Sequence, residues 1–248
     1  MPARSRRTVS SFAAIALVAA VLFGPGSSAK AVEYLDPTHG VVLHEDILYG
    51  EAINARGENE QLFLDLYRPA QGTTTLVDRP LVVFAHGGSF KSGTRKSDEI
   101  AGYLRRMAEH GFAAATISYR LRPVGTAGSK PNHELIVEAA LGDSDTLRDA
   151  HHDMLAAVRF LRANAGTFGI DPDRIAVGGS SAGAVTALQA AINTEDPGES
   201  GTPGVSSEVA AAISVSGAAD PDHIEAGDPP FLMFHGGADT TVPAALGY

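Results

Sequence analysis

Cysteine is absent from all 248 residues of the sequence. Its absence excludes disulfide bonds, thiolate ligands for zinc and a cysteine nucleophile. A domain of this length buries enough apolar surface to fold without disulfides, even on a secretory route. The sequence also lacks internal repeats and low-complexity segments, which favours a single folded domain.

A hydrophobic run long enough to span a bilayer is also missing. The apolar run Phe12–Phe23 is shorter than the ~20 residues that a membrane-spanning helix needs. It follows a basic start, Met1–Arg7, and precedes Ala29-Lys30-Ala31, which is typical of a signal-peptide cleavage site. We therefore predict a secretory signal peptide at residues 1–31, a single mature domain at residues 32–248 and a secreted protein with no membrane span after cleavage. An uncleaved anchor is the alternative.

Basic residues are few. The sequence has 19 Lys and Arg against 29 Asp and Glu, for a net charge of −10. Residues 1–31 hold four of the basic residues and none of the acidic ones, so the mature chain would carry 15 basic and 29 acidic side chains. This balance argues against nucleic acid as a partner, because binding to nucleic acid depends on neutralising phosphates. It argues equally against an anionic membrane surface.

Alternation of apolar segments with turn residues predicts an α/β fold. Asp46–Ala52 and Gln61–Tyr67 are typical of an N-terminal antiparallel hairpin. Leu81–Ala85 is a continuous apolar run, as expected for a strand buried on both faces of a parallel sheet. Later segments extend this alternation: a helix at 98–110, a strand at 112–119, an excursion at 122–144 with a short helix at 133–141, a helix at 146–165, a strand at 174–177, a helix at 184–191, and buried strands at 209–215 and 231–234. The pattern predicts an open, mostly parallel sheet with helices on both faces and a ligand site at the carboxyl ends of its strands.

A glycine-framed serine lies between a predicted strand and a predicted helix. Gly179, Ser181 and Gly183 match the Gly-x-Ser-x-Gly pattern of a nucleophile elbow. The sharp turn leaves room only for very small residues two positions either side of the serine, and it aims the first amides of the helix at the hydroxyl. Ser180 is the alternative nucleophile, but Ala182 would then stand where the second glycine belongs. A serine-capped turn without a catalytic role is the other alternative.

The segment His86-Gly87-Gly88-Ser89-Phe90 directly follows the Leu81–Ala85 strand. Consecutive small residues leave backbone amides accessible, and two such amides together with the amide of Ala182 would form an oxyanion hole. An ordinary glycine turn is the alternative. We expect His86 to brace this loop by hydrogen bonding rather than to act as a base.

A carboxylate follows the predicted strand at 231–234. Asp239 lies in a loop at the end of that strand, where a carboxylate can hold an imidazole. Asp220 and Asp222, which follow the preceding strand, are the fallback candidates. A solvated aspartate that caps the next turn is the alternative without a function.

Together these motifs resemble the α/β-hydrolase superfamily, specifically carboxylesterases of the hormone-sensitive-lipase-like and acetyl-hydrolase-like type. The resemblance covers about residue 45 to the end, and its motifs occur in family order: His86–Gly88, Tyr119–Leu121, Asp171–Ile175, Gly179–Gly183 and His235–Asp239.

The resemblance implies a carboxylic ester hydrolase that cleaves a small-molecule ester through an acyl-enzyme, with no metal or organic cofactor. It implies Ser181 as the nucleophile and Asp239 as the acid of the triad. It also implies oxyanion-hole donors at Gly88, Ser89 and Ala182. Ser89 departs from the lipase-like pattern, which often has a third glycine there, but its amide is still available.

The catalytic histidine of the family follows the acid after one more helix and strand. The sequence stops at Tyr248, nine residues after Asp239, so we expect a chain that lacks its last helix, its last strand and its base. His235 precedes the acid, and the adjacent side chains of His151 and His152 are expected to diverge rather than share a metal. A hydrolase-fold protein that only binds and a serine peptidase on the same fold are the alternatives. The sequence predicts no oligomeric state.

Overall fold

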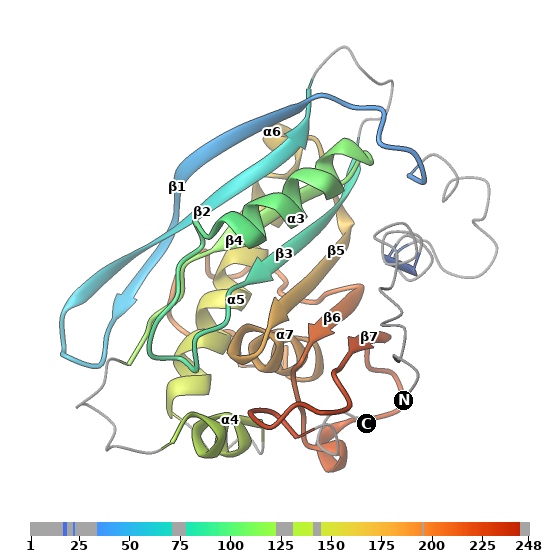
Figure 1. Cartoon of the computed structure of the whole chain (residues 1–248). Coiled ribbons are helices and arrows are strands. Elements are labelled where there is room, and N and C mark those ends of the chain that lie inside the picture. Colours follow the sequence, from blue (N-terminus) through green and yellow to red (C-terminus); the bar gives the residue numbers. More distant parts are fainter. Residues whose placement is uncertain are drawn as a thin grey trace, which may run out of the picture.

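The computed structural model describes residues 17–18, 22, 34–70, 78–122, 131–140, 145–194 and 196–243 (Figure 1). The predicted signal peptide lies outside the described residues except for three positions, Leu17, Val18 and Leu22. Residues 123–130 and 141–144 of the predicted excursion, and the last residues from 244 on, also lie outside them.

The described residues form one seven-stranded sheet (Figure 1). Its strands are β1 (Val41–Ile53), β2 (Asn59–Pro69), β3 (Arg79–Ala85), β4 (Ala113–Ile117), β5 (Ile170–Ser180), β6 (Ala211–Val215) and β7 (Phe231–Phe234). They lie in the order β1-β2-β4-β3-β5-β6-β7. β1 and β2 are an antiparallel pair and β2 is antiparallel to β4, whereas every later pair is parallel. The predicted hairpin and mostly parallel sheet are confirmed.

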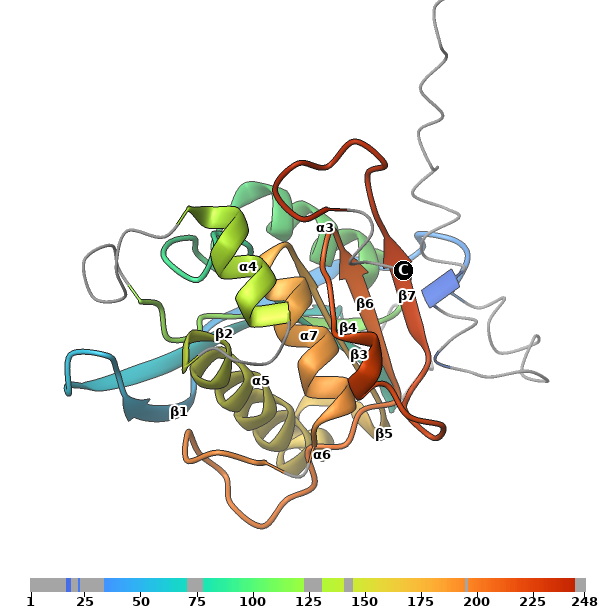
Figure 2. The same ribbon diagram turned by 90° about the horizontal axis from the view of Figure 1, so that it is seen from below.

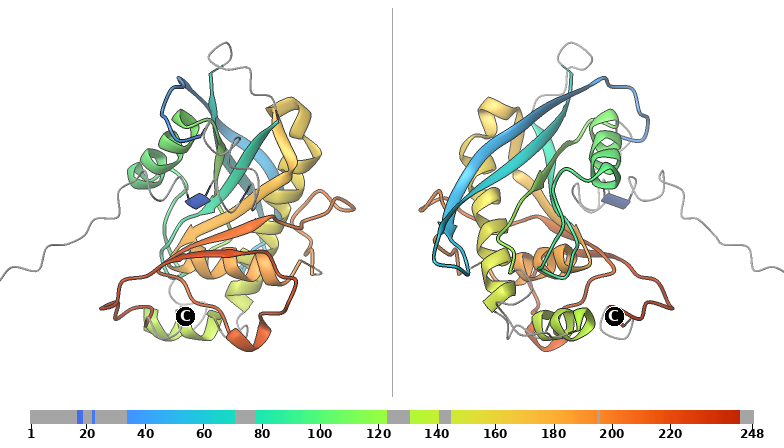
Figure 3. Two further views of the ribbon diagram at one scale, coloured as in Figure 1. Left: turned by 90° about the vertical axis from the view of Figure 1, so that its right-hand side faces the viewer. Right: turned by 60° about the vertical axis from the view of Figure 1, so that its left-hand side comes forward.

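Helices cover both faces of this sheet, as predicted (Figure 3). They are α3 (Asp98–Glu109), α4 (Asn132–Ala140), α5 (Asp145–Ala163), α6 (Ala165–Phe168) and α7 (Ala182–Ile192). α3 packs on one face, against β2 and β4. On the other face α5 and α7 lie side by side (Figure 2), and α7 also contacts β5 and β6. In the described ranges, no helix is both long enough and apolar enough to cross a membrane.

Strand β3 shows why the central strands have no polar face. Leu81, Val83 and Ala85 enter the core shared with α5 and α7. Val82 and Phe84 point the opposite way, into the core shared with α3. Successive strand side chains alternate between the two faces, so a strand between two helical layers must be apolar at every position.

The ends and the buried face of α3 follow directly from its sequence. The Ser97 hydroxyl accepts a hydrogen bond from the Ile100 amide at 3.3 Å and caps the first turn. Ile100, Leu104 and Met107 are buried, as the 3.6-residue period predicts. α3 is therefore anchored to the sheet by this buried face.

Strand β7 differs from its prediction as a buried strand. All four of its residues are only partly buried. β7 pairs with β6 on one side and is the edge strand of the described sheet, so solvent reaches its outer side. The connection from β6 to β7 contains one short 3₁₀ turn, Pro221–His223, in place of a helix.

The parallel strands bring the predicted site segments to one edge of the sheet. The carboxyl end of β3 leads into His86, that of β5 into Ser181, that of β6 into Ser216, and that of β7 into His235. This edge is where open α/β sheets bind their ligands.

Candidate active site

Ser181 occupies a strained turn between β5 and α7. Its backbone has φ 52° and ψ −118°, a region that non-glycine residues rarely adopt. The Ser181 amide donates to the Val215 carbonyl at 2.9 Å, and the Ser181 carbonyl accepts from the Ala184 and Val185 amides at 2.9 and 3.1 Å. These three hydrogen bonds hold the serine in its strained conformation.

The two glycines that frame Ser181 are sterically required. A Cβ on Gly179 would lie 2.1 Å from the backbone carbonyl of Gly183. A Cβ on Gly183 would lie 2.2 Å from the carbonyl oxygen of Ala85, at the end of β3. The crossing of β5, α7 and β3 therefore leaves no space for a side chain at either position. This is the steric requirement that the sequence pattern predicts for the residues two positions either side of the serine.

Ser180, the alternative nucleophile, is placed differently. It is the last residue of β5 and pairs in register with Val215 of β6. Ser181 is the residue that leaves the strand and precedes the first turn of α7. Of the two hydroxyls, the one on Ser181 therefore sits at the helix N-terminus, where negative charge is favoured.

The loop after β3 lies directly against this turn. A Cβ on Gly87 would lie 3.3 Å from the Cβ of Ser181 and 3.0 Å from the carbonyl oxygen of Ser180. Gly88, Ser89 and Phe90 follow with φ of 127°, 53° and 60°. Three consecutive residues with positive φ turn the chain sharply beside the elbow.

Backbone donors are available in two segments that adjoin Ser181, the loop after β3 and the first turn of α7. In the described part of the chain, the amides of Gly88 and Ser89 donate to no protein acceptor. The amide of Ala182 belongs to the first turn of α7, where helix geometry provides no intrahelical partner. The predicted oxyanion donors are therefore uncommitted amides from two neighbouring segments.

His86 braces the loop, as predicted. Its Nδ1 donates to the carbonyl of Gly87 at 2.8 Å, and its ring stacks on Tyr119 at a centroid distance of 4.4 Å. The Tyr119 hydroxyl donates to the His86 carbonyl at 2.7 Å. Burial lowers the pKa of His86. A neutral imidazole tied to its own loop supports the shape of that loop and is not available to Ser181.

Asp239 lies in the loop after β7, with its side chain 19% exposed. Its Oδ1 accepts from the amides of Thr241 and Val242 at 2.9 and 3.0 Å. The Val242 and Thr241 amides, and to a smaller extent the Ser216 hydroxyl, lower the pKa of Asp239. The carboxylate is therefore ionised at neutral pH, and its second oxygen is 3.8 Å from the Nε2 of His235.

Two short steps along the chain connect the acid to the serine. Ser216, whose hydroxyl acts on Asp239, directly follows Val215. The carbonyl of Val215 accepts the amide of Ser181. The end of β6 thus lies between the elbow and the acid loop.

The fallback acids are used locally. The Asp220 side chain accepts from the Asp222 amide at 3.0 Å and caps the 3₁₀ turn. Asp222 itself is exposed. Neither carboxylate has a contact that ties it to the elbow among the described residues.

None of the nine histidines, all of which the structure describes, has a hydrogen bond to Ser181. His235 comes nearest in the topology, but its Nε2 donates to the Val242 carbonyl at 2.8 Å. Only 1% of its side chain is exposed. His235 therefore stabilises the acid loop.

A cavity of about 340 Å³ adjoins the elbow and the loop after β3. Its walls include Phe84, His86, Gly87, Tyr103, Ser180 and Val215. A larger apolar cavity of about 560 Å³ lies between α3 and strands β3, β6 and β7, and none of the predicted site residues lines it. None of the predicted site residues lines the smaller cavity either, but Gly87 and Ser180, the neighbours of Gly88 and Ser181, do.

A buried ion pair between Arg120 and Asp153 links three elements at the end of β4, and the sequence did not predict this link. Arg120 donates from Nη2 to Asp153 Oδ1 at 2.9 Å and from its amide to Asp153 Oδ2 at 2.7 Å. Its Nη1 donates to the carbonyl of Ile53 at 2.9 Å. The pair joins the end of β4 to α5 and β1. Its only sequence signal is the Tyr119-Arg120-Leu121 motif, which does not identify the partner.

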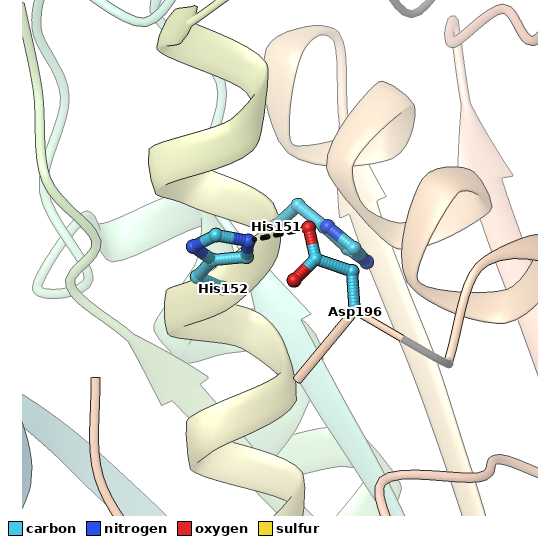
Figure 4. Close-up of side chains that lie close together, drawn as sticks. All are labelled: His151, His152 and Asp196. Carbon is cyan, nitrogen blue, oxygen red and sulfur yellow. Dashed lines mark hydrogen bonds and ion pairs between the residues drawn. The ribbon is translucent and has the colours of Figure 1, made fainter. Parts of the chain in front are cut away.

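The prediction that His151 and His152 diverge is wrong. Their ring centroids are 5.6 Å apart, and Asp196 joins them from the loop after α7 (Figure 4). The ligand atoms of the three side chains all lie within 4.8 Å of one another. Adjacent helix positions start apart, but long side chains on one side of a helix can bend toward a common partner.

Comparison with known proteins places these features in a family. Residues 42–223 match the carboxylesterase family. The chain is 29% identical to Lipase 1 of Geotrichum candidum over 63% of its own length and 28% of that protein. It is 32% identical to a probable isoprenylcysteine alpha-carbonyl methylesterase of Oryza sativa subsp. japonica, over 59% of its length and 29% of that protein. The chain thus spans less than a third of each of these relatives.

A solved structure supports the same fold. Esterase 2 of Thermogutta terrifontis, phosphorylated by paraoxon, superimposes with a TM-score of 0.62 and 25% sequence identity. The superposition covers 84% of this chain and 74% of that one. The predicted resemblance to α/β-hydrolase carboxylesterases is confirmed.

Proposed function

Because this chain belongs to the carboxylesterase family, we propose that it cleaves carboxylic esters and that Ser181 is the nucleophile. The observation that carries the proposal is the strained position of Ser181 between β5 and α7, framed by two glycines that no larger residue can replace. A serine held in this way presents its hydroxyl to a ligand at the carboxyl edge of the sheet.

In the proposed reaction, the Oγ of Ser181 attacks the carbonyl carbon of a small-molecule ester and forms a tetrahedral intermediate. The amides of Gly88, Ser89 and Ala182 bind the negative oxygen of that intermediate. The C–O bond to the alcohol then breaks, and the acyl group stays on Ser181 until water releases it as a carboxylic acid. The scheme involves no metal and no organic cofactor.

Proton transfer requires a histidine that takes the Ser181 proton and passes it to the leaving alcohol, with Asp239 orienting the imidazole. The nine histidines of the sequence make no hydrogen bond to Ser181, so we assign none of them as the base. A serine hydroxyl without a base is a weak nucleophile. We therefore expect residues 1–248 to acylate slowly and to deacylate more slowly still.

The test is exposure of the purified chain to p-nitrophenyl acetate, followed by mass spectrometry of its peptides. We expect slow, stoichiometric acetylation of Ser181, which Ser181→Ala abolishes and Ser180→Ala preserves. Acetylation that persists in Ser181→Ala would contradict the assignment of the nucleophile. Turnover that depends on Ser181 would show that one of the nine histidines reaches it, and would contradict only the expectation about the base.

A second candidate function is binding without hydrolysis, which the lack of a histidine beside Ser181 favours. It predicts that p-nitrophenyl acetate leaves Ser181 unmodified while a non-hydrolysable ester analogue still binds. Isothermal titration of such an analogue, with wild-type protein and a variant that fills the 340 Å³ cavity at Tyr103, tests whether this cavity holds the ester. Tyr103→Trp should weaken binding in either case, whereas acetylation of Ser181 excludes the binding-only function.

We also propose that residues 1–31 direct secretion and are removed, so that the mature chain starts at Val32. The basic start and short apolar run support this proposal. N-terminal sequencing of the protein recovered from the culture medium should read from Val32. An intact Met1 end in the membrane fraction would contradict the cleavage and support an anchor.

A further inference from the structure

Two imidazoles and one carboxylate converge at the end of α7 that is far from Ser181. His151 and His152 project from α5, and Asp196 comes from the loop after α7 (Figure 4). His152 Nε2 and Asp196 Oδ2 are 3.0 Å apart. In the view of Figure 4 the carboxylate lies between the two rings. The cluster joins elements that are 44 positions apart in the sequence.

The donor set matches the preferences of one class of metal ion. Zinc and its neighbours among the divalent transition metals bind imidazole nitrogen at about 2.0–2.1 Å and carboxylate oxygen at about 2.0–2.2 Å. Two ligand atoms of one tetrahedral ion are therefore roughly 3.3 Å apart. The 3.0 Å pair already has this spacing, and all three ligand atoms lie within 4.8 Å of one another.

A second contact prepares His151 for this role. Its Nε2 donates to the carbonyl of Asn193 at 2.7 Å. A carbonyl can only accept, so the proton is on Nε2 and the lone pair is on Nδ1. Histidines that bind metals are commonly oriented in this way by a hydrogen bond from the other ring nitrogen. Only 3% of His151 is exposed, so its ring is held in place before any ion arrives.

The loop that carries Asp196 is shaped to approach His152 closely. Gly198 has φ +62°, and a Cβ there would lie 2.2 Å from the Cγ of His152. Only glycine allows the loop to lie against this ring. Arg159, a cation whose charge acts on His151, is turned toward the carbonyls of Gly201 and Thr202. Its charge is thereby engaged by other groups.

We propose that His151, His152 and Asp196 bind one divalent ion of the zinc class, with water completing its coordination. Magnesium and calcium are not expected, because they select oxygen ligands. α7 has 11 residues, so the site lies about 16 Å along the helix from Ser181. The ion would fasten the loop after α7 to α5. Its role is structural, and the site is independent of the proposed ester hydrolysis.

The test is titration of the purified, chelator-treated chain with Zn²⁺, followed by calorimetry and thermal melting. We expect one Zn²⁺ per chain and a higher Tm. His152→Gln and Asp196→Asn should each weaken binding at least tenfold and remove most of the Zn²⁺-dependent rise in Tm. The matched control is His223→Gln, which changes an exposed histidine of another loop and should bind Zn²⁺ like the wild type.

His151 is buried, so a substitution there would confuse loss of a ligand with loss of folding. The two chosen variants change partly exposed groups, and each is compared with its own metal-free melt. Absence of saturable Zn²⁺ binding would overturn the proposal. So would equal affinity in the wild type, His152→Gln and Asp196→Asn, because the ion would then bind elsewhere. Mg²⁺ that binds as tightly as Zn²⁺ would overturn the assignment of the metal class.

Discussion

The two ends of α7 are built in opposite ways. At its N-terminal end Ser181 is strained, and the residues that hold it are neighbours in the sequence or in adjacent strands. At its C-terminal end the groups that meet, Asn193, His151 and Asp196, come from two segments that are far apart in the sequence. Strain at the first end costs on the order of 1–3 kcal/mol and is a mark of function. The second end carries the cluster of His151, His152 and Asp196, which we propose binds a metal ion.

The largest expected difference in stability is between two glycine-to-alanine variants, one in the first turn of α7 and one in α3. Gly183→Ala places a Cβ 2.2 Å from the Ala85 carbonyl, whereas Gly102→Ala in α3 has nothing within 4 Å. Helix propensity alone would stabilise each variant by up to ~1 kcal/mol. We expect Gly102→Ala to gain stability and Gly183→Ala to lose at least about 2 kcal/mol. Urea unfolding measures both, and equal stabilisation of the two variants would contradict the close packing of the elbow.

The loop after α7 contains two glycines that can be compared in the same way. Gly198 and Gly204 both have positive φ, at +62° and +79°, but only a Cβ on Gly198 would strike another group, His152. Each alanine variant should lose ~1 kcal/mol from backbone strain. Gly198→Ala should lose a further ~1 kcal/mol and weaken Zn²⁺ binding, since Asp196 moves away from His152. Chemical unfolding and Zn²⁺ titration give both results, and identical behaviour of the two variants would contradict the described packing of the loop.

His86, the buried histidine beside the elbow, should make the unfolding free energy depend on pH. Burial lowers the pKa of His86 in the folded protein, so the unfolded chain takes up a proton first as the pH falls. The unfolding free energy should therefore decrease as the pH drops below the ordinary histidine pKa of about 6.5. The unfolding free energy of His86→Gln should depend less on pH. Both proteins are measured in a buffer with a chelator, so that no metal ion is bound. Parallel curves for the two proteins between about pH 4 and 7 would show that His86 does not contribute.

Much of the fold could be predicted because local pattern and final position agree. Ser97 and the stripe of Ile100, Leu104 and Met107 define α3 by themselves. Strand β7 was predicted as buried because its four residues are apolar, but its exposure depends on its place at the edge of the described sheet. The apolar composition of a strand shows that it can be buried, but it does not show whether another element covers it.

The same distinction applies to the two ends of α7. Gly179, Ser181 and Gly183 could be identified because the turn needs those residue types within five positions. The cluster of His151, His152 and Asp196 could not, because its third member comes from a distant loop whose approach depends on Gly198. The adjacent histidines were the only available signal, and ideal helix geometry predicted that they diverge.

The position of the nucleophile is the central claim, and covalent labelling tests it most directly. The intact chain would be treated with paraoxon, digested and mapped by mass spectrometry, with the phosphorylated esterase 2 of Thermogutta terrifontis as the precedent within the fold. We predict one diethylphosphoryl group, on Ser181, with Ser180 unmodified. Labelling of Ser180, or the same labelling pattern in Ser181→Ala, would contradict the assignment of the elbow as the reactive end of α7.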